Sequence, residues 1–213
     1  MQQQVVDARP GLRPVGRGGL VPKMLNHTAR VTHDVAATAD FYTRILGMEI
    51  ASTILDDQVP STGDAFPYFH IFFRMGDGST IAFFECADLP ARSPSSHPAY
   101  DVLDHLALQV NEPSEMARWK TWLVENGVDV LGPIDHKGII ESIYFHDPNG
   151  YRLELTTPID PLWNQHTVQG YEDLRLWVET KNKARERGEH VGDALVGLIR
   201  DVRKNRYGAR EPR

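Results

Sequence analysis

Two histidines and two glutamates stand at matching places along this chain of 213 residues. His27 and His105 each lie in a short apolar segment, and Glu85 and Glu154 each lie near the end of a later one. Neutral imidazole nitrogens and carboxylate oxygens are the donors of an open divalent-metal site. The pattern therefore predicts that one metal-binding design occurs twice: a strand with a histidine, a helix, and a last strand with a glutamate.

The elements around the first pair are indicated by periodicity and by turn residues. Asp34 is a typical helix cap and Gly47 a typical helix stop, while Gly76 to Gly78 read as a hairpin turn. We expect a strand, one helix and three further strands, at Leu25–Val31, Asp34–Leu46, Glu49–Leu55, Tyr68–Met75 and Thr80–Cys86.

The same order of elements recurs after a Pro/Ser-rich stretch at 88–101. Ser114 is expected to cap the second helix and Gly127 to end it. The predicted segments of this second copy are Leu103–Val110, Ser114–Gly127, Val128–Leu131, Ile139–Phe145 and Gly150–Thr156.

The resulting fold class is α+β, with two paired βαβββ modules and a C-terminal helical arm. A four-stranded sheet has an apolar face that it cannot bury alone, so pairing the modules should give a curved mixed sheet around a metal cleft. Two amphipathic helices are expected at Tyr171–Arg187 and His190–Arg206. The predicted organisation is an irregular lead, module one, connector, module two and helical extension, at 1–23, 24–87, 88–101, 102–158 and 159–213.

Composition excludes several other classes of function. A net charge of −6 and an isoelectric point near 5.8 argue against a nucleic-acid partner. Apolar runs stay far below the roughly 20 residues of a membrane-spanning helix, and the N-terminus lacks the apolar core of a signal peptide. Cys86 is the sole cysteine, so an internal disulfide is excluded and a reducing cytoplasm is the expected location.

Two longer stretches resemble a known family. "LNHTARVTHDVAATADFYTRILGMEI" and "SIYFHDPNGYRLELT" are similar to the two ends of the vicinal oxygen chelate superfamily. This superfamily includes glyoxalase I, methylmalonyl-CoA epimerase, fosfomycin and bleomycin resistance proteins and extradiol ring-cleaving dioxygenases. The resemblance covers about residues 24–158 and implies that His27, His105 and Glu154 are metal ligands, the set of the iron dioxygenases. Glu85 falls where glyoxalase I has a fourth ligand.

One motif resembles the extradiol dioxygenases in particular. "IDHKGIIESIYFHDPNGYRLE" implies that His136 is an acid–base residue near the metal and that Tyr144 contacts the substrate. Ser79 departs from the pattern, since these dioxygenases carry a further active-site histidine near that place. The leading prediction is an Fe(II)-dependent dioxygenase that uses O₂ to cleave a catechol-like aromatic substrate.

Two alternatives remain open on the sequence alone. A lyase or isomerase like glyoxalase I or the epimerase would use Glu85 and Glu154 together on Ni, Zn, Co or Mn. A non-catalytic resistance protein would bind a small molecule without turnover. Glu85 could also be an acceptor that orients a histidine, or a general base. A homodimer is expected under the resemblance, although two modules in one chain also allow a site within that chain.

Overall fold

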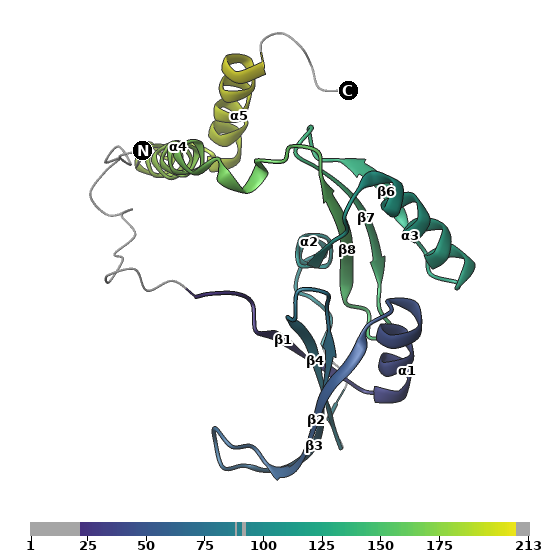
Figure 1. The fold of residues 1–213 in the computed structure, drawn as a ribbon. Coiled ribbons are helices and arrows are strands. Elements are labelled where there is room, and N and C mark those ends of the chain that lie inside the picture. The colour runs from purple at the N-terminus through teal and green to yellow at the C-terminus, as the bar shows by residue number, and fades with distance from the viewer. Residues whose placement is uncertain (1–21, 88, 91–92, 208–213) are drawn as a thin grey trace. The chain divides into compact units, whose positions relative to one another are not determined.

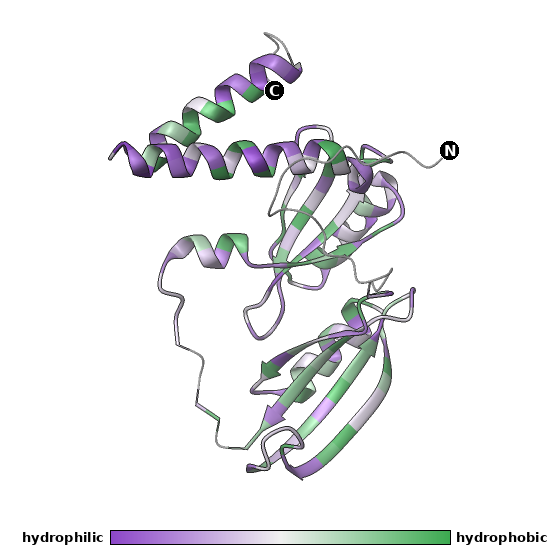
Figure 2. Ribbon diagram, turned by 90° about the vertical axis from the view of Figure 1, so that its left-hand side faces the viewer, coloured by the Kyte–Doolittle hydropathy of each residue, from purple (hydrophilic) through white to green (hydrophobic). Residues whose placement is uncertain are grey.

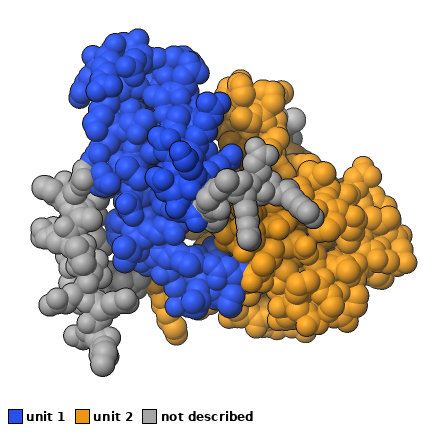
Figure 3. All heavy atoms as spheres, turned by 90° about the horizontal axis from the view of Figure 1, so that it is seen from above, with its two compact units in different colours: residues 1–20, 160–213 blue, residues 21–159 orange. Residues whose placement is uncertain are grey.

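The computed structural model describes residues 22–87, 89–90 and 93–207, so nearly all of the lead expected at 1–23 lies outside the described residues. The chain divides into two compact units (Figure 3). Residues 21–159 form one, which we call the sheet unit, and residues 160–213 together with 1–20 form the other, the helical unit.

The first module of the sheet unit is a four-stranded sheet with one helix (Figure 1). Its strand order is β1-β4-β3-β2, with β1 parallel to β4 and the other pairs antiparallel. Asp34 caps the helix by accepting from the amide of Ala37 at 2.9 Å. The elements are β1 His27–Thr32, α1 Val35–Asp40 with its π-helical continuation Phe41–Ile45, β2 Glu49–Gln58, β3 Ala65–Arg74 and β4 Thr80–Cys86.

The second module repeats this topology with the order β5-β8-β7-β6. It consists of β5 Leu106–Gln109, α3 Pro113–Glu125, β6 Leu131–Asp135, β7 Ile140–His146 and β8 Arg152–Pro158, and a short helix α2 Pro98–Leu103 precedes it. The predicted α+β fold of two βαβββ modules is thus confirmed.

Three local expectations differ from the structure. A strand was expected at Val128–Leu131, but β6 begins only at Leu131. The reason is that Gly127 and the residues after it close helix α3, with the amide of Val128 bonded to the carbonyl of Leu123 at 3.0 Å. The connector expected at 88–101 contains the start of α2. His27 is the first residue of β1 and His105 precedes β5, so both lie at strand entrances rather than mid-strand.

One hydrophobic core serves both modules. Helices α1 and α3 lie on the same side of the two sheets (Figure 1), and apolar and polar residues alternate along several of the strands (Figure 2). Tyr42 stacks on Phe73 with ring centroids 5.2 Å apart and packs against Phe83 at 5.0 Å. The buried cluster continues into the second module through Met116, Leu123, Ile143, Phe145, Leu153 and Leu155.

Polar contacts from the β7–β8 turn fasten the second module to the first. Asp147 accepts from the Tyr42 hydroxyl at 3.2 Å, and Asn149 accepts from the Thr32 hydroxyl at 2.7 Å. Tyr151 donates from its hydroxyl to the carbonyl of Val31 at 3.1 Å. These contacts join the two modules on the side of the sheets that carries the helices. We call the opposite faces of the two sheets the outer faces.

The helical unit contains a short turn and two long helices. These are η2 Trp163–Gln165, α4 Thr167–Glu186 and α5 Val191–Tyr207, close to the two helices predicted from the sequence. Gly188, with φ +66°, lies in the turn between α4 and α5, and Arg206 pairs with Asp173 across the two helices. Within the described part of the chain, no helix is long and apolar enough to cross a membrane.

Candidate metal centre

Glu154 and His105 meet on the outer face of the second sheet. Nε2 of His105 lies 2.8 Å from Oε2 of Glu154. Glu154 is only 2% exposed, because neighbouring side chains cover its carboxylate, whereas the His105 side chain is 32% exposed. A carboxylate removed from water to this extent needs a cation or hydrogen-bond donors to offset its desolvation.

The hydrogen bond made by Nδ1 of His105 sets the orientation of Nε2. Nδ1 lies 2.8 Å from the carbonyl oxygen of Leu103, which can only accept, so Nδ1 carries the proton. In the neutral imidazole, the Nε2 lone pair is then directed at the Glu154 carboxylate. Metal-bound histidines commonly donate their other N–H to a backbone carbonyl in this way. The two donors therefore fit a shared divalent cation.

Ser142 and Tyr144 complete the surroundings of this carboxylate. The buried Ser142 hydroxyl donates to Oε1 of Glu154, and Tyr144 is paired with Glu154 in the ladder between β7 and β8. The Tyr144 hydroxyl lies 2.9 Å from Nε2 of His136. Burial and the charge of Glu154 raise the pKa of the Tyr144 phenol above its usual value. The structure thus brings the two predicted catalytic residues, His136 and Tyr144, next to the predicted ligand.

Two residues of this face were missed by the sequence analysis. Ser142 holds Glu154, and the Arg152 guanidinium lies 4.2 Å from the centre of the Tyr144 ring. Arg152 also donates to the carbonyl of Val102. Arg152 could have been found because it precedes Glu154 by two residues in a strand and must share its face. Ser142 could not, since its place depends on the register between β7 and β8.

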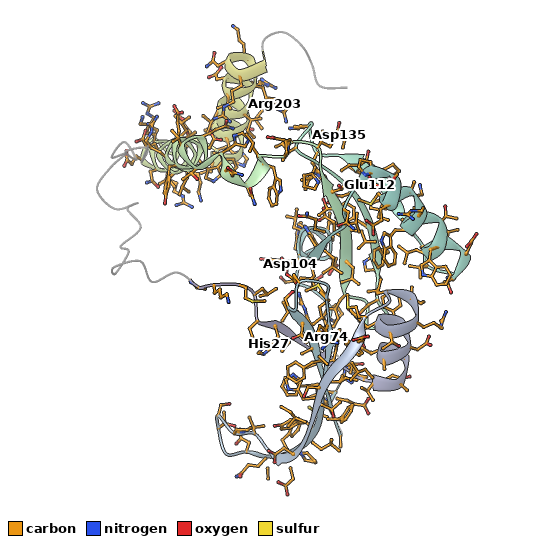
Figure 4. The ribbon with its side chains drawn as sticks, in the orientation of Figure 1. His27, Arg74, Asp104, Glu112, Asp135 and Arg203 are labelled. Carbon is orange, nitrogen blue, oxygen red and sulfur yellow. The ribbon has the colours of Figure 1, made fainter. Side chains whose placement is uncertain are left out.

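His27 lies on the outer face of the first sheet, on the side away from α1 (Figure 4). Its Nδ1 is 2.7 Å from the side-chain oxygen of Asn26, which accepts, so Nε2 again presents a lone pair. The neighbouring rings are those of Phe72 at 5.6 Å and His70 at 6.4 Å between centroids. His27 and His105 are therefore oriented by the same device, a proton on Nδ1 given to an oxygen of a nearby residue.

Glu85 does not share this face. Ala29 and Ala107 each lie two residues after the histidine of their module. In the parallel ladders, Ala29 pairs with Ala82 and Ala107 pairs with Glu154. Ala82 is thus the counterpart of Glu154.

Glu85 lies three residues after Ala82, so its side chain emerges on the helix side of the sheet. There it accepts a hydrogen bond of 2.5 Å from the amide of Val35 at the start of α1. The predicted ligand role of Glu85 does not fit this geometry, and a role in fixing the helix does.

His27 does not join His105 and Glu154 within one chain. Among residues 22–87, 89–90 and 93–207, no three His, Cys, Asp or Glu side chains are placed to hold one ion. The expected single cleft, with ligands from both modules of one chain, is therefore not formed. A pair of donors stands on the second module and a lone imidazole on the first.

Residues 24–155 match the model of the Glyoxalase/Bleomycin resistance protein/Dioxygenase superfamily. The chain belongs to this superfamily. It is 30% identical over 137 residues to a protein of Staphylococcus saprophyticus named metallothiol transferase FosB, a match that covers 62% of the chain and 76% of that protein. It is 26% identical over 137 residues to the putative ring-cleaving dioxygenase MhqA of Bacillus subtilis, and there the match covers 62% of the chain but only 39% of the relative.

Two solved structures to which this chain is similar have different names. A glyoxalase/dioxygenase from Nostoc punctiforme matches with a TM-score of 0.46 and 25% identity, over 71% of this chain and 99% of its own. The fosfomycin resistance protein FosX from Listeria monocytogenes matches with a TM-score of 0.48 and 20% identity, over 65% and 95%.

Proposed function

We propose that the chain is a metal-dependent vicinal oxygen chelate enzyme whose ion is held between two copies of the chain. His105 and Glu154 of one copy would supply two ligands, and His27 of the second copy would supply the third. The observation that carries this proposal is the 2.8 Å approach of Nε2 of His105 to Oε2 of Glu154, with the Nδ1 proton of the histidine donated to the carbonyl of Leu103.

Apolar residues exposed on the edge strands of both outer faces support a site shared by two chains. Every residue of β2, the edge strand of the first sheet, is exposed. Ile54 on the outer face of the first sheet is 44% exposed, and Leu131 on that of the second is 58% exposed. In a two-fold symmetric dimer, the first module of each chain can face the second module of its partner. This arrangement would cover both faces and bring His27 to the other two ligands.

The most specific candidate activity is Fe(II)-dependent extradiol cleavage of a catechol-like aromatic substrate by O₂. When bound, a ferrous ion with two histidines and one carboxylate offers open positions for a chelating diol and for O₂. The contact between Tyr144 and His136 supports this candidate. The Tyr144 oxygen can accept the proton of a substrate hydroxyl while its own proton passes to Nε2 of His136.

A second candidate is transfer of a thiol to a chelating substrate, supported by the 30% identity to metallothiol transferases over 76% of their length. The same three ligands would serve, and a thiolate would take the place of O₂ as the second reactant. A glyoxalase-like isomerase is less well supported, because the carboxylate of Glu85 is occupied at the start of α1.

The test is to load the full chain with Fe(II) under anaerobic conditions and to follow O₂ uptake on a panel of catechols. A parallel sample carries Mn(II), fosfomycin and L-cysteine, with thiol adducts measured by mass spectrometry. We expect O₂ consumption and a ring-opened product in the first sample and no adduct in the second. Silence across the catechol panel together with adduct formation would reject the dioxygenase and support the transferase.

A further inference from the structure

His70 is a buried imidazole that the metal site as described so far does not use. It lies in β3 on the outer face of the first sheet and is 6% exposed. Its Nε2 is buried and finds no hydrogen-bond partner among the described residues. A buried polar atom left unpaired costs free energy, and such atoms are uncommon in folded proteins. The described residues therefore leave this nitrogen without the hydrogen-bond partner that a buried imidazole normally has.

Two phenylalanines hold the His70 ring in place. Its centroid lies 3.6 Å from that of Phe84, with the rings 19° from parallel, and 4.1 Å from that of Phe72. Both phenylalanines are half-buried on the outer face of the sheet. His70 is stacked on Phe84 and tilted by 42° from Phe72, and the three rings form a packed aromatic cluster, which we call the aromatic wall.

The aromatic wall adjoins the ligand that the first module contributes. His27 lies 6.4 Å from His70 and 5.6 Å from Phe72 between ring centroids. A neutral imidazole can donate from one nitrogen and accept at the other. A molecule bound beside His27 thus lies close to a hydrogen-bonding group packed between aromatic rings.

A purely structural role explains these features less well. For packing alone, a phenylalanine or leucine at this position would fill the same space without an unpaired nitrogen. His70 also belongs to no group of three metal-binding side chains within the described residues. What distinguishes it is the combination of burial, an unpaired Nε2 and a place next to His27 on the same face.

We propose that His70 is a substrate-binding residue, whose imidazole makes a hydrogen bond with a polar atom of a planar substrate lying against Phe72 and Phe84. The substrate class is a flat aromatic chelator with a polar group that the metal does not hold. This inference rests on the proposed function, because the ion bound by His27 is what brings the substrate to the aromatic wall.

The test compares metal binding and ligand binding in variants of the full chain. The probe is 4-nitrocatechol, a coloured planar chelator, titrated into Fe(II)-loaded protein under anaerobic conditions. His70→Phe keeps the stacked ring and removes both nitrogens, and His70→Gln restores a hydrogen-bonding group near the place of Nε2. His33→Gln is the matched control, because His33 is an exposed histidine of the same module just after β1.

We expect His70→Phe to bind Fe(II) like the wild type and to bind 4-nitrocatechol about tenfold more weakly, the loss of one hydrogen bond to a bound ligand. His70→Gln should recover part of that loss, and His33→Gln should match the wild type. If His70→Phe proves unstable, judged by its thermal unfolding, the comparison of His70→Gln with a second variant, His70→Leu, carries the same expectation.

Two results would overturn the inference. One is unchanged affinity for 4-nitrocatechol in every folded His70 variant. The other is a loss of Fe(II) together with the probe, which would make His70 a ligand or a support of the metal. Failure of the proposed function has a different signature, because the wild-type protein itself would then bind no metal, and the inference would fall with it.

Discussion

The two modules have the same topology and the same ladder register but different outer faces. In the second module the position two residues beyond the histidine is paired with Glu154, and in the first it is paired with Ala82. Around Glu154 lie hydroxyl, phenol and guanidinium groups, whereas beside His27 lie aromatic rings and His70. The two modules thus repeat the same backbone positions, while the side chains at those positions differ in charge and polarity.

This division has a physical reason. A second buried carboxylate on the first module would add a desolvation cost with no second ion to offset it. In the proposed dimer, the anionic half of one chain would face the aromatic half of the other, so that each site would combine one buried carboxylate with an apolar wall. The predictions below alter one half at a time.

The largest effect is expected from Glu154→Gln, which keeps the shape of the side chain and removes the charge. We expect the affinity for Fe(II) to fall by more than about 100-fold, beyond the loss usual when only a supporting group of a metal ligand is removed. Elemental analysis after reconstitution measures this. A Glu154→Gln protein with one equivalent of metal would show that the carboxylate is not a ligand.

A smaller effect is expected from Tyr144→Phe, which interrupts the contact with His136. The variant should bind metal normally and lose about 100-fold in kcat on whichever substrate supports turnover, the lower end of what a proton-transfer group contributes. Tyr100→Phe is the control, since Tyr100 is 54% exposed on α2. Equal rates in the two variants would remove Tyr144 from the reaction.

Glu85→Gln should lower the stability of the fold and leave the metal content unchanged. The variant loses a charge-assisted hydrogen bond to the amide of Val35 at the start of α1, worth about 1 kcal/mol of unfolding free energy. Chemical denaturation and metal analysis of the same preparation test both statements. Loss of metal with unchanged stability would show that Glu85 is a metal ligand and would support the glyoxalase-like alternative.

The smallest effect near neutral pH is expected from Tyr42→Phe, although its effect grows at alkaline pH. Burial and the Asp147 carboxylate raise the pKa of Tyr42 well above 10 in the folded chain, while in the unfolded chain it is about 10. The phenol therefore contributes stability that is present below about pH 10 and is lost as pH rises further.

Removing the Tyr42 hydroxyl should weaken this alkaline dependence, as measured by denaturation at a series of pH values, with Tyr100→Phe as control. An unchanged pH profile would mean that Tyr42 is not the group responsible.

Much of the fold followed from local patterns. Alternation of apolar residues and the turn residues near Gly76 and Gly150 were enough to place the strands within a few residues. The motif that ends at Glu154 also pointed to His136 and Tyr144, which the structure places in contact.

What local patterns did not predict depends on contacts distant in sequence. The face of Glu85 is decided by its position in the β4 ladder, where a shift of one residue reverses the side chain, and the sequence does not fix that register. The same holds for the joining of the two modules. It depends on contacts of the β7–β8 turn with the first module through Asp147 and Asn149, which no local pattern predicts.

The most direct test of a site shared by two chains is complementation between two defective ones. His27→Ala and Glu154→Gln chains are produced together, and the metal content of the mixture is compared with that of each chain alone. Each alone should bind little Fe(II), and the mixture should regain about a quarter of the wild-type content, because random pairing gives mixed dimers with one intact site each. A mixture that binds no more metal than its separate components would contradict the account.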